Sequence, residues 1–363
     1  MLKRKRKFIE KIFSIRNDET CHKIVYIFGI RIRIRSKIVF LKNEIRKLKD
    51  KIQADENQDL VKPCYYIAPP LGPEYNADED ALFSNLDEEA TANLNKILAV
   101  NKHASMSYAF MKKYPSIYEL YDKQELKQIK EYKKCLHKAV RENDYFLYEN
   151  YKLPINHISP EVFYYKHGLE RIKNDKYLDG KTIIDAGAFI GDSMLMFRDR
   201  FPENEIISFE PVEKIYNLLL KTIELNNVKN VKAENYGLGD KEGVYYVDNS
   251  LNFPYVSKNK TTLNCQAMRV TTLDSYVEKN NIRVGLIKSD IEGFEQKLLR
   301  GGGQMIFKQK PILIISIYHN YSDFFKIKPL IESWNLGYRF DFFRGVDGMT
   351  TFADTMLICE PRN

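Results

Sequence analysis

The chain has few cysteines and no long apolar run, and both absences narrow the classes to which it can belong. Its five cysteines are odd in number and show no CxxC spacing. This argues against a disulfide framework and a thiolate metal site, and it fits a reducing, cytoplasmic location. The most apolar stretches, residues 24–30 and 312–318, hold seven residues each, against the roughly 20 that a membrane-spanning helix needs. Glu10, Lys11 and Arg16 interrupt the apolar core that a secretory signal requires.

What the chain does contain is enough apolar surface for a large core. Its hydrophobic fraction is 44%, with 24 Tyr and 21 Phe, so the chain as a whole is not disordered. Its 363 residues predict two domains, or one large domain with appendages. The charge is concentrated at one end, because residues 1–50 hold 16 Lys/Arg and only 5 Asp/Glu. No basic face interleaved with aromatic side chains follows, so nucleic acid is not an expected partner, whereas peripheral contact with an anionic inner-membrane face is.

Residues 1–53 are predicted to form a basic arm. The apolar side chains of residues 8–15 share one helical face, which would lie on anionic lipid or dock on the protein itself. Alternating Ile and Arg in residues 30–35 predict two short strands over residues 23–36. Residues 40–53 predict a short amphipathic helix, which would pair two subunits of a homo-oligomer or pack against the body.

The remaining chain divides into three further segments. Residues 54–80 hold four prolines and are expected to be a linker, and residues 81–158 a helical region with a helix start at Asp87. In residues 159–363 strands alternate with helices, which predicts an α/β domain with a mainly parallel sheet covered on both faces. The expected strands are residues 182–186, 205–210, 231–236, 284–289, 311–318, 338–343 and 355–360, with an antiparallel excursion at 241–247 and 267–270.

A glycine-bracketed loop follows the first of these strands. It runs from Asp185 through Gly187 to Gly191, and a helix is predicted from Asp192. Gly187 lets a ligand approach the backbone closely, and Gly191 permits tight entry to the helix. The spacing is DxGxxxG rather than GxGxxG. Asp185 would repel the pyrophosphate of a dinucleotide but suits an amine such as the methionine end of S-adenosylmethionine, and an ordinary tight turn is the alternative.

Two further strand ends add to this interpretation. Glu210 closes the second strand, where an acid is placed to bind both hydroxyls of a ribose and disfavours a 2′-phosphate, so NADP is not expected. Asn235, Tyr236 and Gly237 close the third strand, where they would lie beside an adenine. A plain turn explains Gly237 equally well.

Charged residues gather at the end of the fourth strand, in the run from Lys288 through Asp290 and Glu292. Alternation along an extended chain would place these three on one side. Two carboxylates there would share a proton or hold a divalent cation, and the spacing does not decide between these, so no metal is predicted. His319 follows the fifth strand. An unperturbed pKa near 6.5 suits a general base, and a histidine that caps the backbone is the alternative.

At these residues the chain resembles the FkbM-type S-adenosylmethionine-dependent methyltransferases. The resemblance covers about residues 160–361, through IIDAGAFIGDS, ISFEPV, NYGLGD-KEG, VGLIKSDIEGFEQKLLRGG and ISIYHNYSDFFKI. It implies a class I, Rossmann-like fold with a seven-stranded sheet, S-adenosylmethionine as cofactor, and O-methylation of sugars. KIFSIRND…CHKIVYIFGIRIRI resembles segments of bacterial lipopolysaccharide and capsule enzymes. One departure is Tyr318, where many members have an acidic residue before the histidine.

By position, the resemblance implies that Asp185, Gly187 and Gly191 form the methionine-side loop, that Glu210 binds the ribose, and that Asp290 and Glu292 are the site carboxylates. From the residues themselves, Asp290, Glu292 and His319 are expected to bind the acceptor and take its proton, and Lys288 and Tyr318 to bind a sugar or nucleotide-sugar substrate. A nicotinamide-dependent sugar oxidoreductase and an inactive scaffold recruited to the membrane by the basic arm remain the rival hypotheses. The expected cofactor-binding residues are Asp185, Gly187, Ala188, Gly191, Asp192, Ser193, Glu210, Asn235, Tyr236, Gly237 and Asp290.

Overall fold

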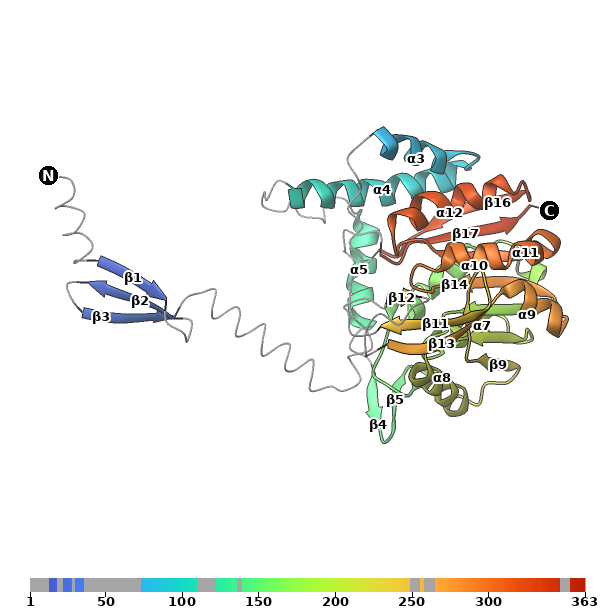
Figure 1. Cartoon of the computed structure of the whole chain (residues 1–363), viewed down its shortest axis with the longest axis horizontal. Helices are drawn as coiled ribbons and strands as arrows, with labels where there is room; N and C mark the ends of the chain where they lie inside the picture. Colours follow the sequence, from blue (N-terminus) through green and yellow to red (C-terminus); the bar gives the residue numbers. More distant parts are fainter. Residues whose placement is uncertain are drawn as a thin grey trace. The chain divides into compact units, whose positions relative to one another are not determined.

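The structure, a computed structural model, divides into two compact units, Met1–Val61 and Lys62–Asn363. In the first unit, β1 (Phe13–Asn17), β2 (His22–Ile27) and β3 (Ile30–Arg35) form an antiparallel sheet in that order (Figure 1). The residues that the structure describes are 13–17, 22–27, 30–35, 73–109, 122–135, 139–248, 255–257, 265–346 and 353–362.

The first unit confirms two predicted strands and corrects the helix expected before them. β2 and β3 are the pair expected over residues 23–36. Phe13–Asn17 is a third strand, so the predicted helix does not extend over residues 13–15. Pairing with β2 along its whole length gives this stretch backbone partners, whereas an isolated helix that short would be marginal in water. The helix predicted over residues 40–53 lies outside the described residues.

The second unit is built around a seven-stranded sheet of order β16-β17-β15-β14-β7-β8-β9. Only β17 runs antiparallel to its neighbours, β15 and β16, and every other adjacent pair is parallel. This confirms the predicted mainly parallel α/β fold. The strands are β7 (Thr182–Ala186), β8 (Ile206–Phe209), β9 (Val231–Glu234), β14 (Val284–Ser289), β15 (Ile312–Ser316), β16 (Tyr338–Phe343) and β17 (Met356–Pro361).

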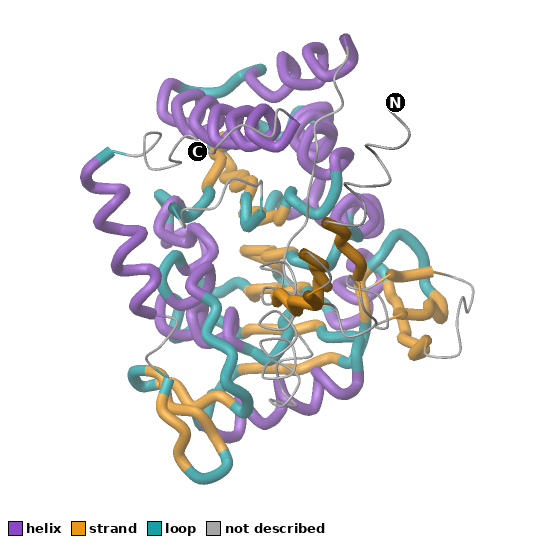
Figure 2. The backbone as a smooth tube through the Cα atoms, turned by 90° about the vertical axis from the view of Figure 1, so that its left-hand side faces the viewer, coloured by secondary structure: helices purple, strands orange, loops and turns teal. Residues whose placement is uncertain are grey.

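Helices cover both faces of this sheet (Figure 2). From β7 the chain proceeds to β8 and β9 on one side, and later to β14 and β15 on the other. Because such crossovers are right-handed, the helices of the two halves lie on opposite faces. The first half carries α7 (Asp192–Arg200) and α8 (Glu213–Leu225), and the second carries α9 (Leu273–Asn280), α10 (Glu295–Gly301), α11 (Gly303–Gln309) and α12 (Tyr321–Ser333).

The central strands are buried along their whole length, as β7, β14 and β15 show. Their Ile, Val and Leu side chains pack against helices on both faces, which is the usual composition of a central parallel strand. The polar exceptions stand near the carboxyl ends, where Asp185, Lys288 and Ser289 are buried. Buried polar groups of this kind need partners, so this edge of the sheet is where a functional site is expected.

The excursion between β9 and α9 forms a separate four-stranded sheet of order β10-β13-β11-β12. β11 pairs antiparallel with β13, as predicted, and also with β12, which was not predicted, while β10 runs parallel to β13. Its strands are β10 (Gly237–Leu238), β11 (Gly243–Asp248), β12 (Tyr255–Ser257) and β13 (Cys265–Thr271).

The segment that precedes the α/β domain is only partly as predicted. α3 (Pro73–Phe83) begins inside the expected linker, with proline at the first position, where its missing N–H is not needed. α4 (Glu88–Ala109) starts where expected, since Asp87 Oδ1 accepts a hydrogen bond from the Ala90 N–H at 2.8 Å. α5 (Lys123–Cys135) is also helical. α3 packs on α12, and α4 packs on β16 (Figure 1).

Residues 140–153 are an antiparallel three-stranded sheet, which corrects the predicted helical region. β4 (Val140–Glu142), β5 (Tyr145–Tyr148) and β6 (Tyr151–Leu153) are joined by tight turns. Asn143 and Glu149 have φ angles of 51° and 53° at these turns, and the aromatic run favours strand. The short α6 (Pro160–Phe163), η3 (Lys166–Arg171) and η4 (Asp175–Leu178) lead into β7. Within the described residues, no helix combines the length and apolar character needed to cross a membrane.

Candidate active site

The site lies at the carboxyl ends of β7 and β14, where the strand order reverses and where open α/β sheets bind ligands. The loops after these strands touch. The Asp290 N–H donates to the Ala186 carbonyl at 3.0 Å. Gly187 has a φ of 74°, and a Cβ there would lie 1.9 Å from the Asp290 carbonyl oxygen. Only glycine fits such an approach, so the predicted cofactor loop and the predicted catalytic loop form one structure.

Several backbone N–H groups of the glycine loop are bound within the protein. The N–H groups of Gly187 and Ala188 both donate to the Phe209 carbonyl at 3.0 Å, and the Gly191 N–H donates to the Ala188 carbonyl at 2.8 Å. A pyrophosphate site needs such amides free to face the anion. These three N–H groups are therefore occupied within the protein and do not face a pyrophosphate, which argues against the nicotinamide-dependent alternative.

A buried pair of charges holds this loop in place. Asp185 is fully buried, and its Oδ2 accepts a hydrogen bond from Ser193 Oγ at 2.7 Å. Lys288 Nζ lies 3.3 Å from Asp185 Oδ1 and donates to the Gly187 carbonyl at 2.9 Å. Burial lowers the pKa of Lys288, but Asp185 and the nearby Asp290 and Asp192 outweigh this and raise it, so the lysine stays charged. Lys288 therefore contacts the cofactor loop, and its expected contact with the acceptor stays a prediction.

Two other buried carboxyls of the cofactor half have raised pKa values. Burial raises the pKa of Glu210 to about 7, although the backbone N–H groups of Val212 and Phe189 bind it and oppose the shift. Burial also raises the pKa of Asp192 to about 6. Glu210 stands at the end of β8, as predicted. A carboxylate there gains hydrogen bonds when a ligand supplies hydroxyl donors.

The residues predicted beside an adenine have protein partners in the structure. Asn235 Nδ2 donates to the carbonyls of Glu210 at 2.9 Å and Pro211 at 3.2 Å, and so ties the ends of β8 and β9 together. The Tyr236 ring lies under the Arg269 guanidinium, 4.3 Å from its carbon. Contact of these side chains with a nucleobase stays a prediction.

Asp290, Glu292 and His319 meet at the ends of β14 and β15. His319 Nε2 lies 3.2 Å from Asp290 Oδ1 and 3.8 Å from Glu292 Oε2. The His319 side chain is only 1% exposed, against 23% for Asp290 and 43% for Glu292. Tyr318 Oη donates to Asp290 Oδ1 at 3.2 Å. The structure thus brings together the residues expected to act on the acceptor, with the two carboxylates on the open side.

The expected alternation of Lys288, Asp290 and Glu292 on one side is wrong. β14 ends at Ser289, and Glu292 has a φ of 57°, so the chain turns instead of remaining extended. Lys288 consequently faces the glycine loop, while Glu292 turns towards His319. Period-two reasoning holds only as far as the strand continues.

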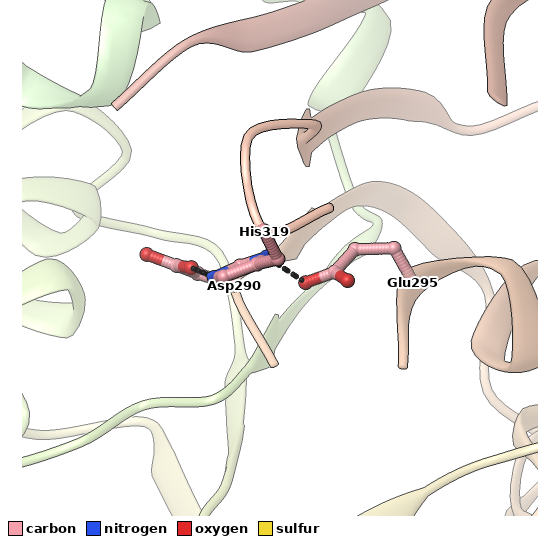
Figure 3. A group of neighbouring side chains, drawn as sticks. All are labelled: Asp290, Glu295 and His319. Atoms are coloured by element: carbon pink, nitrogen blue, oxygen red, sulfur yellow. Dashed lines mark ion pairs between the residues drawn. The ribbon is translucent and has the colours of Figure 1, made fainter. Parts of the chain in front are cut away.

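Sequence reasoning missed the role of Glu295, the first residue of α10. Its side chain is fully buried, and Oε1 lies 3.1 Å from His319 Nδ1 (Figure 3). Burial lowers the pKa of His319, but Glu295 and Asp290 reverse this and hold it well above its usual 6.5. The histidine is therefore an imidazolium at neutral pH. Burial raises the pKa of Asp290, but the ion pair with His319 and the charge of Lys288 together outweigh this and lower it well below its usual range.

His167, in η3, was also missed, because it precedes the α/β motifs and no spacing marks it. It is 6% exposed, its Nδ1 has no hydrogen-bond partner among the described residues, and burial lowers its pKa to about 3. The charges of Lys288 and Asp290 act on it, which places it at this end of the sheet. Lys166, His167 and Gly168 all have left-handed backbone, with φ between 48° and 72°.

Fold and site together define a class of enzyme. A class I S-adenosylmethionine-dependent methyltransferase has four parts that are all present here. They are the seven-stranded sheet with β17 as its antiparallel strand, the DxGxxxG loop after β7, the acid after β8 and the charged cluster after β14. Residues 185–340 match the family model of the methyltransferase FkbM domain. This part of the chain is thus similar to the FkbM methyltransferase domain. The protein is an S-adenosylmethionine-dependent methyltransferase, and its cofactor is S-adenosylmethionine.

Two fungal proteins and one bacterial structure are similar to the chain. "Methyltransferase 1" of Beauveria bassiana is 26% identical over 217 residues, which cover 53% of this chain and 85% of that protein. "Methyltransferase sdnD" of Sordaria araneosa is 30% identical over 115 residues, covering 30% of this chain and 43% of that protein. The crystal structure of methyltransferase FkbM from Methylobacillus flagellatus KT is 17% identical, with a TM-score of 0.49, over 79% of this chain and 59% of that chain.

Proposed function

We propose that the protein transfers the methyl group of S-adenosylmethionine to a hydroxyl oxygen, and that the hydroxyl belongs to a sugar. The observation that carries this proposal is the Asp290 carboxylate. It stands at the end of β14, it is ionised, and 23% of its side chain is exposed while its partner His319 is covered. An ionised carboxylate in this position accepts a hydrogen bond from an acceptor hydroxyl and orients the oxygen's lone pair towards the methyl carbon.

The reaction is a displacement at carbon, and its proton balance assigns the role of base. The carbon–oxygen bond forms as the carbon–sulfur bond breaks, so the sulfonium becomes a neutral thioether and the positive charge passes to the acceptor oxygen. The hydroxyl proton, increasingly acidic as this happens, is taken by Asp290. Because the proton leaves late, a carboxylate with a low pKa is sufficient. We assign the role of base to Asp290 and not to His319, because the raised pKa of His319 favours a ring that already holds its proton.

A sugar is the acceptor class that best suits this half of the site. Asp290 already has a cationic partner in His319, so it does not need a charged acceptor as its partner. Asp290 and Glu292 together provide four carboxylate oxygens on the open side, which suit the adjacent hydroxyls of a sugar ring. We place the acceptor among nucleotide sugars or surface glycans, in line with the sequence resemblance of the amino-terminal segment to glycan-synthesis enzymes.

Labelled methyl transfer tests this function. The protein would be incubated with methyl-labelled S-adenosylmethionine and a panel of nucleotide sugars and glycans, with Asp290→Asn as the control that keeps the side-chain shape. The proposal expects an O-methyl sugar from the wild type and about 10²–10⁴-fold slower product formation from the variant. Label that appears on nitrogen or carbon of another acceptor, with no sugar methylated, would refute it.

The basic arm suggests a location for this activity. With a net charge of +11 in residues 1–50, we propose that the arm attaches a cytoplasmic enzyme to the anionic face of a membrane, since each basic residue near such a surface contributes about 1 kcal/mol. Removal of residues 1–52 should abolish sedimentation with phosphatidylglycerol vesicles and leave S-adenosylhomocysteine binding intact. Added salt should weaken binding of the full chain. Vesicle binding that survives the truncation would exclude this role.

A further inference from the structure

Glu295 is a buried acid for which the reaction has no direct use. It is the first residue of α10, its side chain is fully buried, and Oε1 accepts a hydrogen bond from the Ile291 N–H at 2.8 Å. The same oxygen lies 3.1 Å from His319 Nδ1. Burying a carboxylate is costly unless a charge or strong donors accompany it. A glutamate held here without exposure therefore requires an explanation within the site.

The arrangement of the three side chains shows what Glu295 does. Asp290 and Glu295 lie at opposite edges of the His319 ring, so that carboxylate, imidazole and carboxylate follow one another in a row (Figure 3). Within the described residues, these three offer oxygen and nitrogen atoms within 4.8 Å of one another. A metal ion needs its ligands to converge on one point, whereas here both ring nitrogens face a carboxylate of their own. The cation that this geometry accommodates is the imidazolium.

We propose that Glu295 is a positioning residue that holds His319 as an imidazolium, which in turn fixes Asp290 as an ionised, correctly aimed acceptor for the substrate hydroxyl. The inference rests on the proposed function, because it gives Asp290 that role. Exposure increases along the row, from Glu295 and His319 at the buried end to Asp290 at the open end. Glu295 thus affects the substrate only through the ring and the second carboxylate.

Charged groups from every neighbouring element agree with this assignment. Glu292, from the loop after β14, lies 3.8 Å from His319 Nε2. The charge of Asp323, near the start of α12, also interacts with His319 and with Glu295. Tyr318 Oη also donates to Asp290, and the charge of Lys288 acts on it. The acids around the ring outnumber the cations, so a neutral His319 would leave Glu295 as an uncompensated buried charge.

The test measures the charge of His319 directly, without any acceptor. The full chain would be labelled with ¹⁵N at its six histidines, and the His319 signals identified by their loss in His319→Asn. In the wild type, both ring nitrogens of His319 should have the ¹⁵N chemical shifts of protonated nitrogens at pH 7.5. In Glu295→Gln, His319 should become neutral by that pH, because one of its two carboxylate partners is gone. Glu295→Asp, which keeps the charge, should retain the imidazolium.

Asp323→Asn is the matched control, since it removes a buried acid of the same cluster that does not lie against the ring. His319 should stay protonated in it. A neutral His319 in the wild type, or an unchanged signal in Glu295→Gln, would overturn the proposal. Stoichiometric Mn²⁺ that selectively broadens the His319 signals would also overturn it, in favour of a metal site. If Glu295→Gln fails to fold, the wild-type signals and Glu295→Asp still decide the charge of the ring.

Kinetics then separate this inference from the proposed function. With an acceptor in hand, Glu295→Gln should lower kcat about 10²-fold, because a misaimed Asp290 loses alignment with the methyl carbon, while KM for S-adenosylmethionine stays unchanged. If His319 is an imidazolium in the wild type but the protein methylates no hydroxyl, the proposed function is rejected. The charged arrangement of Glu295, His319 and Asp290 would still stand. Wild-type kcat in Glu295→Gln with a neutral His319 would reject the positioning role alone.

Discussion

The two halves of the crevice balance their buried charges in different ways. In the cofactor half, at the ends of β7 and β8, burial raises the pKa of Asp192 to about 6 and that of Glu210 to about 7. In the acceptor half, at the ends of β14 and β15, His319 lies between Asp290 and Glu295, and it lowers the pKa of Asp290. One half has carboxyls that resist ionisation, and the other has a carboxylate that is firmly ionised.

This difference matches the two ligands of a methyl transfer. S-adenosylmethionine brings a sulfonium, an ammonium, a carboxylate and two ribose hydroxyls, so its cationic groups and hydroxyl donors suit the buried carboxyls Asp192 and Glu210. The acceptor hydroxyl is neutral and brings no counter-charge, so Asp290 needs the partner that it already has in His319 before the acceptor binds. The site therefore gains favourable electrostatics on binding the cofactor, and it is preorganised for the acceptor.

The largest effect should come from the point where the two halves touch. Gly187→Ala would force a Cβ to within 1.9 Å of the Asp290 carbonyl oxygen, so the domain should lose several kcal/mol of stability or fail to fold. Gly180→Ala is the matched control, because Gly180 also has a positive φ, of 66°, but open space around its Cβ. It should cost only about 1–2 kcal/mol. Equal shifts of the two melting temperatures would show that loop contact is unimportant.

Asp290→Asn should have the next largest effect, confined to the acceptor half. Loss of the carboxylate should lower kcat about 10²–10⁴-fold and leave the affinity for S-adenosylhomocysteine within about twofold. Titration calorimetry and single-turnover rates would measure the two quantities. A variant that binds the cofactor poorly but turns it over normally would mean that the two halves have been assigned the wrong way round.

Glu210→Ala should affect the cofactor half alone. Removing a hydrogen-bonded carboxylate should weaken S-adenosylhomocysteine binding by roughly 1.5–3 kcal/mol, the range for bonds to a charged group. Glu234, at the end of the neighbouring β9, provides the comparison: Glu234→Ala, which removes an acid paired with Lys232 and Tyr276, should change binding far less. If Glu210→Ala bound S-adenosylhomocysteine as tightly as the wild type, Glu210 could not be the residue that binds the ribose.

The sheet was largely predictable from the sequence, because its strands are short, buried and bounded by clear breaks. The strands at Thr182–Ala186, Val284–Ser289 and Tyr338–Phe343 have the predicted bounds. The errors lie where local signals conflict. In residues 140–153, helix-forming Lys and Glu surround an aromatic run, and the left-handed turns at Asn143 and Glu149 decide in favour of strands.

The sequence predicted which residues lie near one another at the candidate site, but it did not predict their charges. Strand ends identified Asp185, Glu210, Asp290 and His319, since carboxyl ends of parallel strands share one edge. The charge of His319 depends on Glu295, which reaches the ring only because α10 begins directly after the left-handed turn at Glu292. Spacing alone does not reveal such a contact. His167 lies in η3, outside the α/β pattern, and no sequence motif or spacing marks it.

The central claim is that burial raises the pKa of Glu210 to about 7, so that this carboxyl is only partly ionised at neutral pH before the cofactor binds. The pH dependence of cofactor binding tests this claim most directly. A group with a pKa of about 7 must lose its proton before it can accept both ribose hydroxyls, so affinity should fall as the pH drops through 7. Calorimetry should show S-adenosylhomocysteine binding to wild type about tenfold more weakly at pH 6 than at pH 8. In Glu210→Gln the difference should shrink to about twofold, the remainder coming from Asp192. Equal wild-type affinity at the two pH values, or a tenfold difference that persists in Glu210→Gln, would contradict the account.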